Sequence, residues 1–249
     1  MDDAAVAGQH KHSPSILSAL DRQMIEKLVP RVPRTIRSHH LTLLTLLWSA
    51  LILAGDALAA KNRAWLFAVS FVVVAQYVSD AIDGKLGVLR GDGLVRWGFY
   101  MDHLLDYVFL CAVLLGYALL VPAQLQWLMM VILIVAVGFM VSSFLACGVE
   151  GDLGISFLGL GPVEVRLIFI AINMWLAAGG RAPLAAVLPI VILVSLAALV
   201  SLIARTQARL WRADNHDSAI INPNRQSPIA NLNRQSPIAD RHSISLPTR

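Results

Sequence analysis

The chain has 249 residues, of which 57% are hydrophobic and 14% charged. Soluble domains have about 45–50% apolar and about 25% charged residues, so this composition excludes an ordinary soluble protein and predicts an integral membrane protein. The formal net charge of +4 comes largely from the tails and short loops. This distribution of charge indicates that the basic residues interact with an anionic membrane surface and not with nucleic acid.

Residues 1–38 are expected to form a cytoplasmic segment. From Ser13 to Val29, apolar residues recur at helical spacing and charged residues occupy the other faces, which predicts an amphipathic helix. This pattern fits a helix on the membrane surface and a helix packed under the bundle equally well. Pro30 and Pro33 end the helix. The arginines around them are expected to anchor the chain where it enters the membrane: Arg31, Arg34 and Arg37.

Six apolar segments follow, and each is close to the roughly 20 residues that a membrane-spanning helix needs. All but three of the 20 Lys and Arg residues then lie on the side of the two termini, which the positive-inside rule identifies as the cytoplasm. The sequence therefore predicts an all-α integral membrane protein: a six-transmembrane-helix bundle over residues 39–206 with both termini cytoplasmic. The spans are expected at 41–60, 64–83, 98–120, 125–147, 162–180 and 184–206.

Residues 207–249 are polar and contain a tandem repeat, NPNRQSPIA at 222–230 and NLNRQSPIA at 231–239. Two copies of a nine-residue polar unit cannot build a core, so a flexible tail is predicted. A docking or phosphorylation role for Ser227 and Ser236, each followed by proline, remains open.

Four aspartates stand at the ends of two apolar segments: Asp80 and Asp83, three residues apart, and Asp102 and Asp106, four residues apart. On helices each pair shares one face. A charged aspartate in a span costs about 2.5–3.5 kcal/mol at the membrane centre and less near its edge, and four repel one another. A divalent cation with a preference for oxygen ligands, Mg²⁺ or Mn²⁺, would offset this cost. The alternative is that they only mark span ends in water.

The stretch from Asp80 to Asp106 resembles the signature of the CDP-alcohol phosphotransferase family, DxxDGxxAR followed after eight or nine residues by GxxxDxxxD. Gly84 and Gly98 match the signature, as do all four aspartates, with the longer of the two spacings. The signature is long and specific. The six-span layout extends the resemblance over roughly residues 35 to 206.

The resemblance implies transfer of a substituted phosphate from a CDP-linked donor to an alcohol, with release of CMP. It assigns Asp106 as the base that deprotonates the acceptor hydroxyl. Gly84 and Gly98 would leave room for the nucleotide, and Gly87 keeps a small residue where the family has alanine. The implied ligands of the metal ion are Asp80, Asp83, Asp102 and Asp106.

Where the family signature has arginine, this chain has Val88. A neutral side chain cannot replace a guanidinium that contacts a donor phosphate. The candidates to replace this arginine, from the same stretch, are Lys85, Arg90 and Arg96. The alternative is a catalytically inactive family member that acts as a lipid- or partner-binding membrane protein.

Glu164 and Arg166 open the fifth expected span in the sequence GPVEVR. Residues two apart do not face each other on a helix, so a simple ion pair between them is not expected. Two roles are open for these residues: they bind the polar substrate, or they anchor the span at the membrane interface. Asp56 lies near the outer end of the first expected span, about 22 Å along the axis from Leu41, and is expected to be solvated.

The expected partners are a CDP-linked donor and an alcohol acceptor, at least one of them a lipid, and the resemblance allows a homodimer. The expected location is a prokaryotic cytoplasmic membrane, with the active site facing the cytoplasm. A transporter with an acidic pathway is a weaker alternative, because no inverted repeat is visible in the chain.

Overall fold

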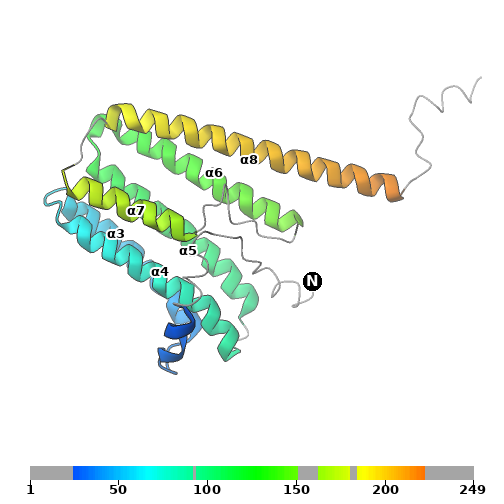
Figure 1. Cartoon of the computed structure of the whole chain (residues 1–249), viewed down its shortest axis with the longest axis horizontal. Helices are drawn as coiled ribbons and strands as arrows, with labels where there is room; N and C mark the ends of the chain where they lie inside the picture. The colour runs from blue at the N-terminus through cyan, green and yellow to red at the C-terminus, as the bar shows by residue number, and fades with distance from the viewer. Residues whose placement is uncertain (1–24, 92–93, 151–161, 180–183, 222–249) are drawn as a thin grey trace, which may run out of the picture. The chain divides into compact units, whose positions relative to one another are not determined.

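The computed structural model describes residues 25–91, 94–150, 162–179 and 184–221, and these residues are mainly helical and contain no strand. Two 3-10 turns, η1 (Val29–Arg31) and η2 (Ala123–Leu125), precede the first and fourth of the long helices. The helices, shown in Figure 1, are α3 (Ser38–Ala59), α4 (Trp65–Arg90), α5 (Val95–Leu120), α6 (Gln126–Glu150), α7 (Pro162–Ala177) and α8 (Leu184–Ile221).

The helix ends follow from local sequence. Helix α4 ends at Gly91, whose φ of +62° lies in the left-handed region that glycine adopts without strain. At the start of α3, the backbone N–H of Arg37 donates to Nδ1 of His40 at 3.1 Å. Helix α7 begins with Pro162. Proline has no backbone N–H, and it loses no hydrogen bond in the first turn of a helix because N–H groups there have no acceptor within the helix.

Within the described ranges, five helices are long and apolar enough to cross a membrane, which indicates a multi-pass membrane protein. The segment expected as the fifth span, 162–180, corresponds to α7, which has 16 residues. At 1.5 Å per residue it is about 24 Å long, shorter than the hydrocarbon core of about 30 Å. The six-span count and the orientation of the termini therefore stay predictions.

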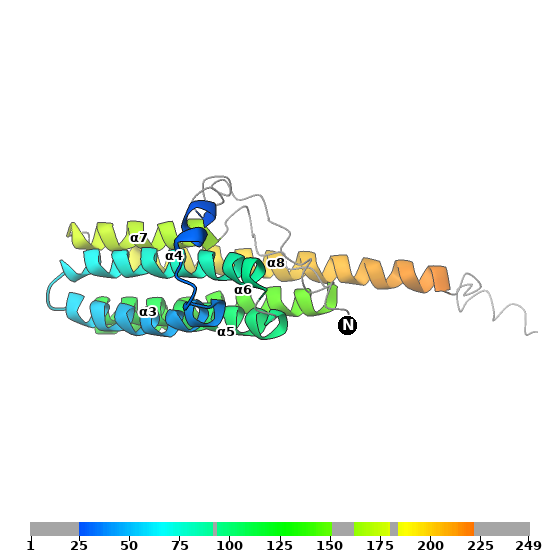
Figure 2. The ribbon, with the colours of Figure 1, turned by 90° about the horizontal axis from the view of Figure 1, so that it is seen from below.

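By its contacts the chain divides into residues 1–203 and residues 204–249. In the first unit α3 packs against α4 and α5, α4 packs against α7, and α5 packs against α6. Figure 2 shows α3, α4, α5 and α7 running alongside one another. The second unit contains the rest of α8, which continues past residue 206 to Ile221.

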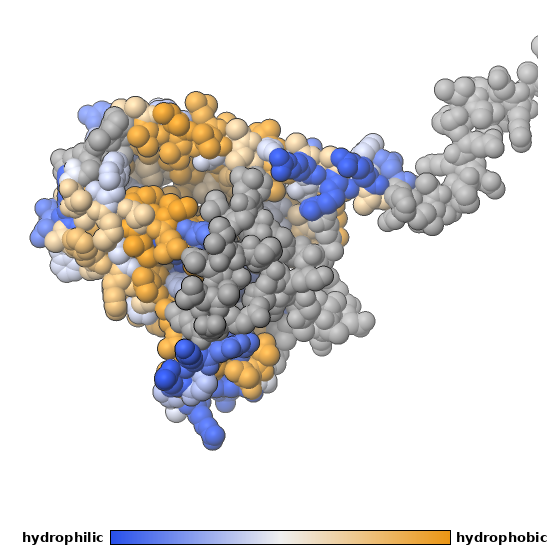
Figure 3. Space-filling model, viewed as in Figure 1, coloured by the Kyte–Doolittle hydropathy of each residue, from blue (hydrophilic) through white to orange (hydrophobic). Residues whose placement is uncertain are grey.

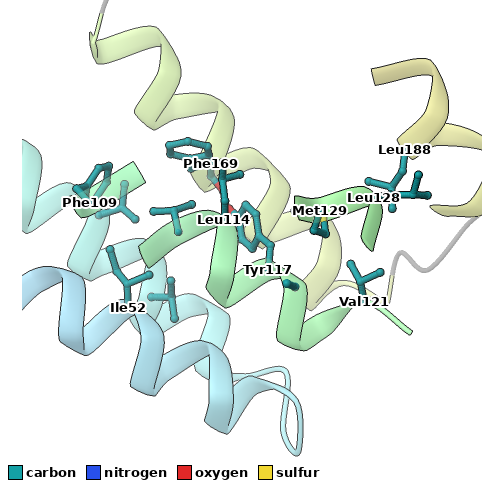
Figure 4. Packing of buried hydrophobic residues seen from close by; sticks show 13 residues of the cluster. Ile52, Phe109, Leu114, Tyr117, Val121, Leu128, Met129, Phe169 and Leu188 are labelled. Atoms are coloured by element: carbon teal, nitrogen blue, oxygen red, sulfur yellow. The ribbon is translucent and has the colours of Figure 1, made fainter. Parts of the chain in front are cut away.

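The core of the first unit lies between α3, α4, α5 and α7. Ile52, Val73, Val113 and Phe169, one from each of these helices, are buried together (Figure 4). The hydroxyl of Tyr117 donates to the backbone carbonyl of Phe169 at 3.0 Å and joins α5 to α7. Because lipid tails are as apolar as these side chains, close packing and such polar contacts stabilise the bundle rather than hydrophobic burial.

The outer surface is apolar, as expected for helices that face lipid. Phe71 and Ile134 are 72% and 70% exposed. Figure 3 shows an apolar band over α7, with polar residues of the segment before α3 and of the turn between α3 and α4 at its two ends. This distribution is typical of a membrane-embedded bundle.

The tails extend beyond the described residues. Most of the predicted amphipathic helix and the whole of the nine-residue repeat lie outside them. The described end of the N-terminal segment, from Ile25, is helical to Leu28. Ile25 and Leu28 pack against a small buried cluster that includes Ile82 and Leu86 of α4. This end of the segment therefore contacts the bundle.

The expectation that Asp56 is solvated is wrong, because its side chain is fully buried. In the described part of the chain neither of its carboxylate oxygens has a hydrogen-bond partner. Its carboxyl group lies against Gly116 of α5, where a Cβ atom would come within 2.9 Å of the Asp56 Cγ. Position near the end of a span gives the depth of a residue but not the face of the helix on which it lies.

We expect Gly116→Ala to destabilise the bundle by about 1–3 kcal/mol, because the added methyl group overpacks the contact between α3 and α5. Gly148→Ala is the matched control, since a Cβ at Gly148 has no atom of the described residues within 4 Å. Thermal unfolding in detergent measures both, and Asp56→Ala in the Gly116→Ala background should restore part of the loss. Equal melting temperatures for the two glycine variants would contradict this packing.

Candidate functional site

The four aspartates lie inside helices rather than at their ends. Helix α4 continues seven residues past Asp83 to Arg90, and α5 begins at Val95, before Asp102. The stretch from Asp80 to Asp106 is therefore the end of one helix, a turn and the start of the next. Asp80 and Asp83 therefore lie on α4, Asp102 and Asp106 lie on α5, and both helices pack against α3.

Arg166 of α7 is the centre of the site. Its side chain is 7% exposed, and its Nη2 lies 2.8 Å from Oδ2 of Asp80 and 3.6 Å from Oδ1 of Asp106. Its Nε donates to Oε1 of Gln76 at 2.8 Å. The carboxylates of α4 and α5 thus converge on one buried cation supplied by a third helix.

Two aromatic rings flank the same guanidinium. Its central carbon lies 5.6 Å from the ring centroid of Tyr77 and 5.5 Å from that of Phe109. Cation–π contacts at this distance contribute about 0.5–2 kcal/mol, the larger values where the cation is desolvated. Together with Gln76, the rings fix the position of the Arg166 side chain.

Asp83 faces α3. Its carboxylate accepts hydrogen bonds from Oγ of Ser38 and, at 2.5 Å, from Oγ1 of Thr42. Both hydroxyls lie in the first turns of α3, and they satisfy a carboxylate that is itself buried. Asp102 lies one turn before Asp106 and is partly exposed.

The donor set is chemically suited to Mg²⁺ or Mn²⁺, because carboxylate oxygens are the ligands these ions prefer. Among the described residues, no three His, Cys, Asp or Glu side chains are grouped closely enough to hold one metal ion. Asp80 and Asp106 nevertheless approach the same positive group from two helices. The four aspartates therefore suit a divalent cation by their chemistry, and in this structure the positive group that Asp80 and Asp106 approach is Arg166.

The glycines of the signature differ in their surroundings. A Cβ atom at Gly84 or Gly98 would have none of the described residues within 4 Å, so both leave space beside the aspartates in the described part of the chain. At Gly87 a Cβ would lie 3.2 Å from Oγ of Ser38. The small residue at Gly87 therefore serves the close approach of α3 to α4.

The residues considered as replacements for the signature arginine lie away from Arg166. Val88 is 75% exposed and faces out of the bundle. Arg90 donates to the backbone carbonyls of Val32 (2.8 Å), Pro33 (3.2 Å) and Ile36. Lys85 and Arg96 are exposed. Arg166, in contrast to Arg90, contacts two of the signature aspartates, Asp80 and Asp106.

Glu164 lies in the first turn of α7, where an acidic side chain interacts favourably with the positive end of the helix dipole. It is partly buried.

Sequence reasoning missed Gln76, Ser38 and Thr42. Gln76 precedes Asp80 by four residues and so shares its helix face, and Ser38 and Thr42 have the same spacing. Isolated polar residues at this spacing in an apolar segment were the available signal. What they contact on other helices could not be read from spacing.

Comparison with known proteins identifies the family of the chain. The family model described as CDP-alcohol phosphatidyltransferase matches residues 33–212. This match covers α3 to α7 and most of α8, including all four aspartates and Arg166. Among curated proteins no sequence gave a significant match. The chain belongs to the CDP-alcohol phosphatidyltransferase family.

Proposed function

We propose that the chain transfers a substituted phosphate group from a CDP-alcohol, such as CDP-diacylglycerol, to the hydroxyl group of an alcohol and releases CMP. The observation that supports this best is the convergence of Asp80 and Asp106, from two helices, on the buried guanidinium of Arg166. Phosphoryl transfer depends mainly on positioning and on neutralisation of phosphate charge. A buried site that gathers carboxylates and a fixed cation suits both requirements.

In this proposal Asp80, Asp83, Asp102 and Asp106 hold Mg²⁺ or Mn²⁺, which when bound neutralises phosphate charge. Asp106 accepts the proton of the acceptor hydroxyl. Its side chain is 40% exposed, compared with 24% for Asp80, so an acceptor can approach it more easily. Ser38 and Thr42 orient the Asp83 carboxylate through their hydrogen bonds.

Arg166 is proposed to supply the phosphate contact that Val88 cannot make. Its guanidinium has a planar set of donors that matches phosphate oxygens, and Gln76 already fixes its orientation. An arginine in place of Val88 would start from a position that faces out of the bundle. The cation for the donor phosphate therefore comes from α7 instead of α4.

The setting suggests the class of substrate. Gly84 and Gly98 leave room beside the aspartates for a nucleotide, and the apolar outer surface gives a lipid access from the membrane. Family membership supports phosphatidyl transfer in phospholipid synthesis. We further propose a cytoplasmic site, six spans and both termini in the cytoplasm, from the distribution of Lys and Arg.

A second candidate is a catalytically inactive lipid- or partner-binding protein on the same scaffold, which the neutral Val88 favours. The two differ in one measurement. Purified protein is incubated with CDP-diacylglycerol or other CDP-alcohols and a panel of acceptors, with Mg²⁺ or Mn²⁺ and with a chelator. Metal-dependent CMP release supports the enzyme, and its absence with every CDP-alcohol supports the inactive protein.

Asp106→Asn is expected to lower CMP release by about 10²–10⁴-fold, because general-base catalysis contributes this much. The matched control is Asp214→Asn, the same chemical change at an exposed position outside the family match. Initial rates at saturating metal measure both variants. If Asp106→Asn retained the rate of Asp214→Asn, the proposed base would be wrong.

Arg166→Gln is expected to lower CMP release by at least about tenfold, since it removes charge-assisted hydrogen bonds worth about 1.5–3 kcal/mol each. Val88→Arg should change the rate by less than about threefold, because its side chain faces outward. Size-exclusion profiles check that each variant is folded. Full activity of a folded Arg166→Gln variant, or a large gain from Val88→Arg, would contradict the role of Arg166.

A further inference from the structure

A cationic pocket lies at the base of α4, apart from the aspartate site. It has a volume of about 470 Å³ and is lined by Arg34, Arg37, Arg90 and Gly91. Arg90 follows Asp83 by seven residues, which corresponds to about 10 Å along the helix axis. The pocket is therefore two turns further along α4 than the signature carboxylates, and the proposed reaction does not use it.

The wall of the pocket is held in place by Arg90. Its guanidinium donates to the backbone carbonyls of Val32, Pro33 and Ile36, and these three bonds fix the segment before α3 against the end of α4. Arg34 lies between the residues whose carbonyls Arg90 binds, and Arg37 follows the last of them. Their positions relative to Arg90 are thus set by backbone contacts rather than by chance proximity of surface side chains.

Among the residues that the structure describes, nothing in the lining compensates the positive charge of the pocket. The described lining contains three guanidinium groups and no carboxylate. Within the described part of the chain, neither Arg34 nor Arg37 forms an ion pair. Three cations facing one space repel one another, and an anion bound between them would remove this repulsion. Guanidinium groups bind phosphate oxygens in a bidentate manner, so phosphate is the anion they fit best.

The position of the pocket favours a lipid as the source of the phosphate. Arg37 immediately precedes Ser38, the first residue of a helix that is long and apolar enough to cross the membrane. The pocket therefore opens where the chain enters the bilayer, at the level of lipid headgroups. Its volume falls in the range of about 300–1,000 Å³ that small-molecule sites have, larger than a single phosphate needs.

We propose that the pocket formed by Arg34, Arg37 and Arg90 binds the phosphate group of an anionic phospholipid headgroup. Basic pockets at the ends of membrane helices bind anionic headgroups by this chemistry. Arg90 shapes the pocket through its backbone contacts, and Arg34 and Arg37 present the free donors. Free inorganic phosphate can form the same contacts with the guanidinium groups, so the experiment distinguishes it from the lipid.

The test uses the purified full-length chain in detergent and native mass spectrometry during titration with phosphatidylglycerol or phosphatidylcholine. The pocket variant is Arg34→Gln with Arg37→Gln. The control is Lys27→Gln with Arg31→Gln, which removes the same charge from the same segment outside the pocket lining. Arg90 is left intact because it holds the segment.

The pocket variant is expected to bind phosphatidylglycerol at least about tenfold more weakly than the wild type, and the control to bind it nearly as well. Phosphatidylcholine, which has no net charge, should bind weakly to all three proteins. Equal weakening in the pocket variant and the control would overturn the proposal, since it would show attraction by overall charge. Circular dichroism of the pocket variant confirms that the helices are intact.

Excess inorganic phosphate separates the two sources. If it does not displace phosphatidylglycerol from the wild type, the site selects the lipid, as proposed. If it displaces the lipid and its own binding is lost in the pocket variant, the site takes phosphate but the lipid source is wrong. Neither result depends on CMP release, so the pocket and the proposed reaction are tested separately.

Discussion

The structure depends on the charge of one buried side chain, Arg166. An arginine removed from water is unstable without acceptors, and so are carboxylates removed from water without donors. Here each compensates the other, since Arg166 pairs with Asp80 and lies close to Asp106. Loss of one partner from a buried pair costs about 3–5 kcal/mol, so this contact constrains how α4, α5 and α7 can pack.

The contacts of Arg166 also explain how the short helix α7 is held against the longer helices. Helix α7 packs along α4 and places Arg166 between Gln76 and Asp80. In lipid, helices associate through close packing and interhelical hydrogen bonds because burial of apolar surface gives no driving force. Arg166 forms hydrogen bonds from α7 to α4, and the Tyr117 hydroxyl forms one from α5 to α7. Structure and candidate chemistry therefore rest on the same residues.

Much of the site could be predicted from the sequence, because spacing is informative within a helix. The aspartate pairs, the glycines and the family all follow from the stretch between Asp80 and Asp106. The family match confirms the family, and the roles of the individual residues stay predictions. Helix ends were less well predicted: α4 continues to Arg90, since polar residues near a membrane edge do not by themselves end a helix.

Contacts between helices could not be predicted, because they depend on the rotation of each helix about its axis. Asp56 was expected in water and is buried, and Gln76 was not recognised as the partner of Arg166. For the same reason, the sequence offered Lys85, Arg90 and Arg96 as replacements for the missing arginine, whereas for Arg166 it left open only binding of the polar substrate or anchoring at the interface. The fold separates Arg90 from Arg166, since Arg90 binds backbone carbonyls and Arg166 binds Asp80.

The central claim is that Arg166 and Asp80 stabilise each other inside the bundle, and a double-mutant cycle tests it most directly. The free energy of unfolding is measured in detergent with a chelator for the wild type, Arg166→Gln, Asp80→Asn and the double variant. We predict that each single change is destabilising and that the double variant loses clearly less than the sum of the two, by about 1–3 kcal/mol. Additive losses would contradict the claim.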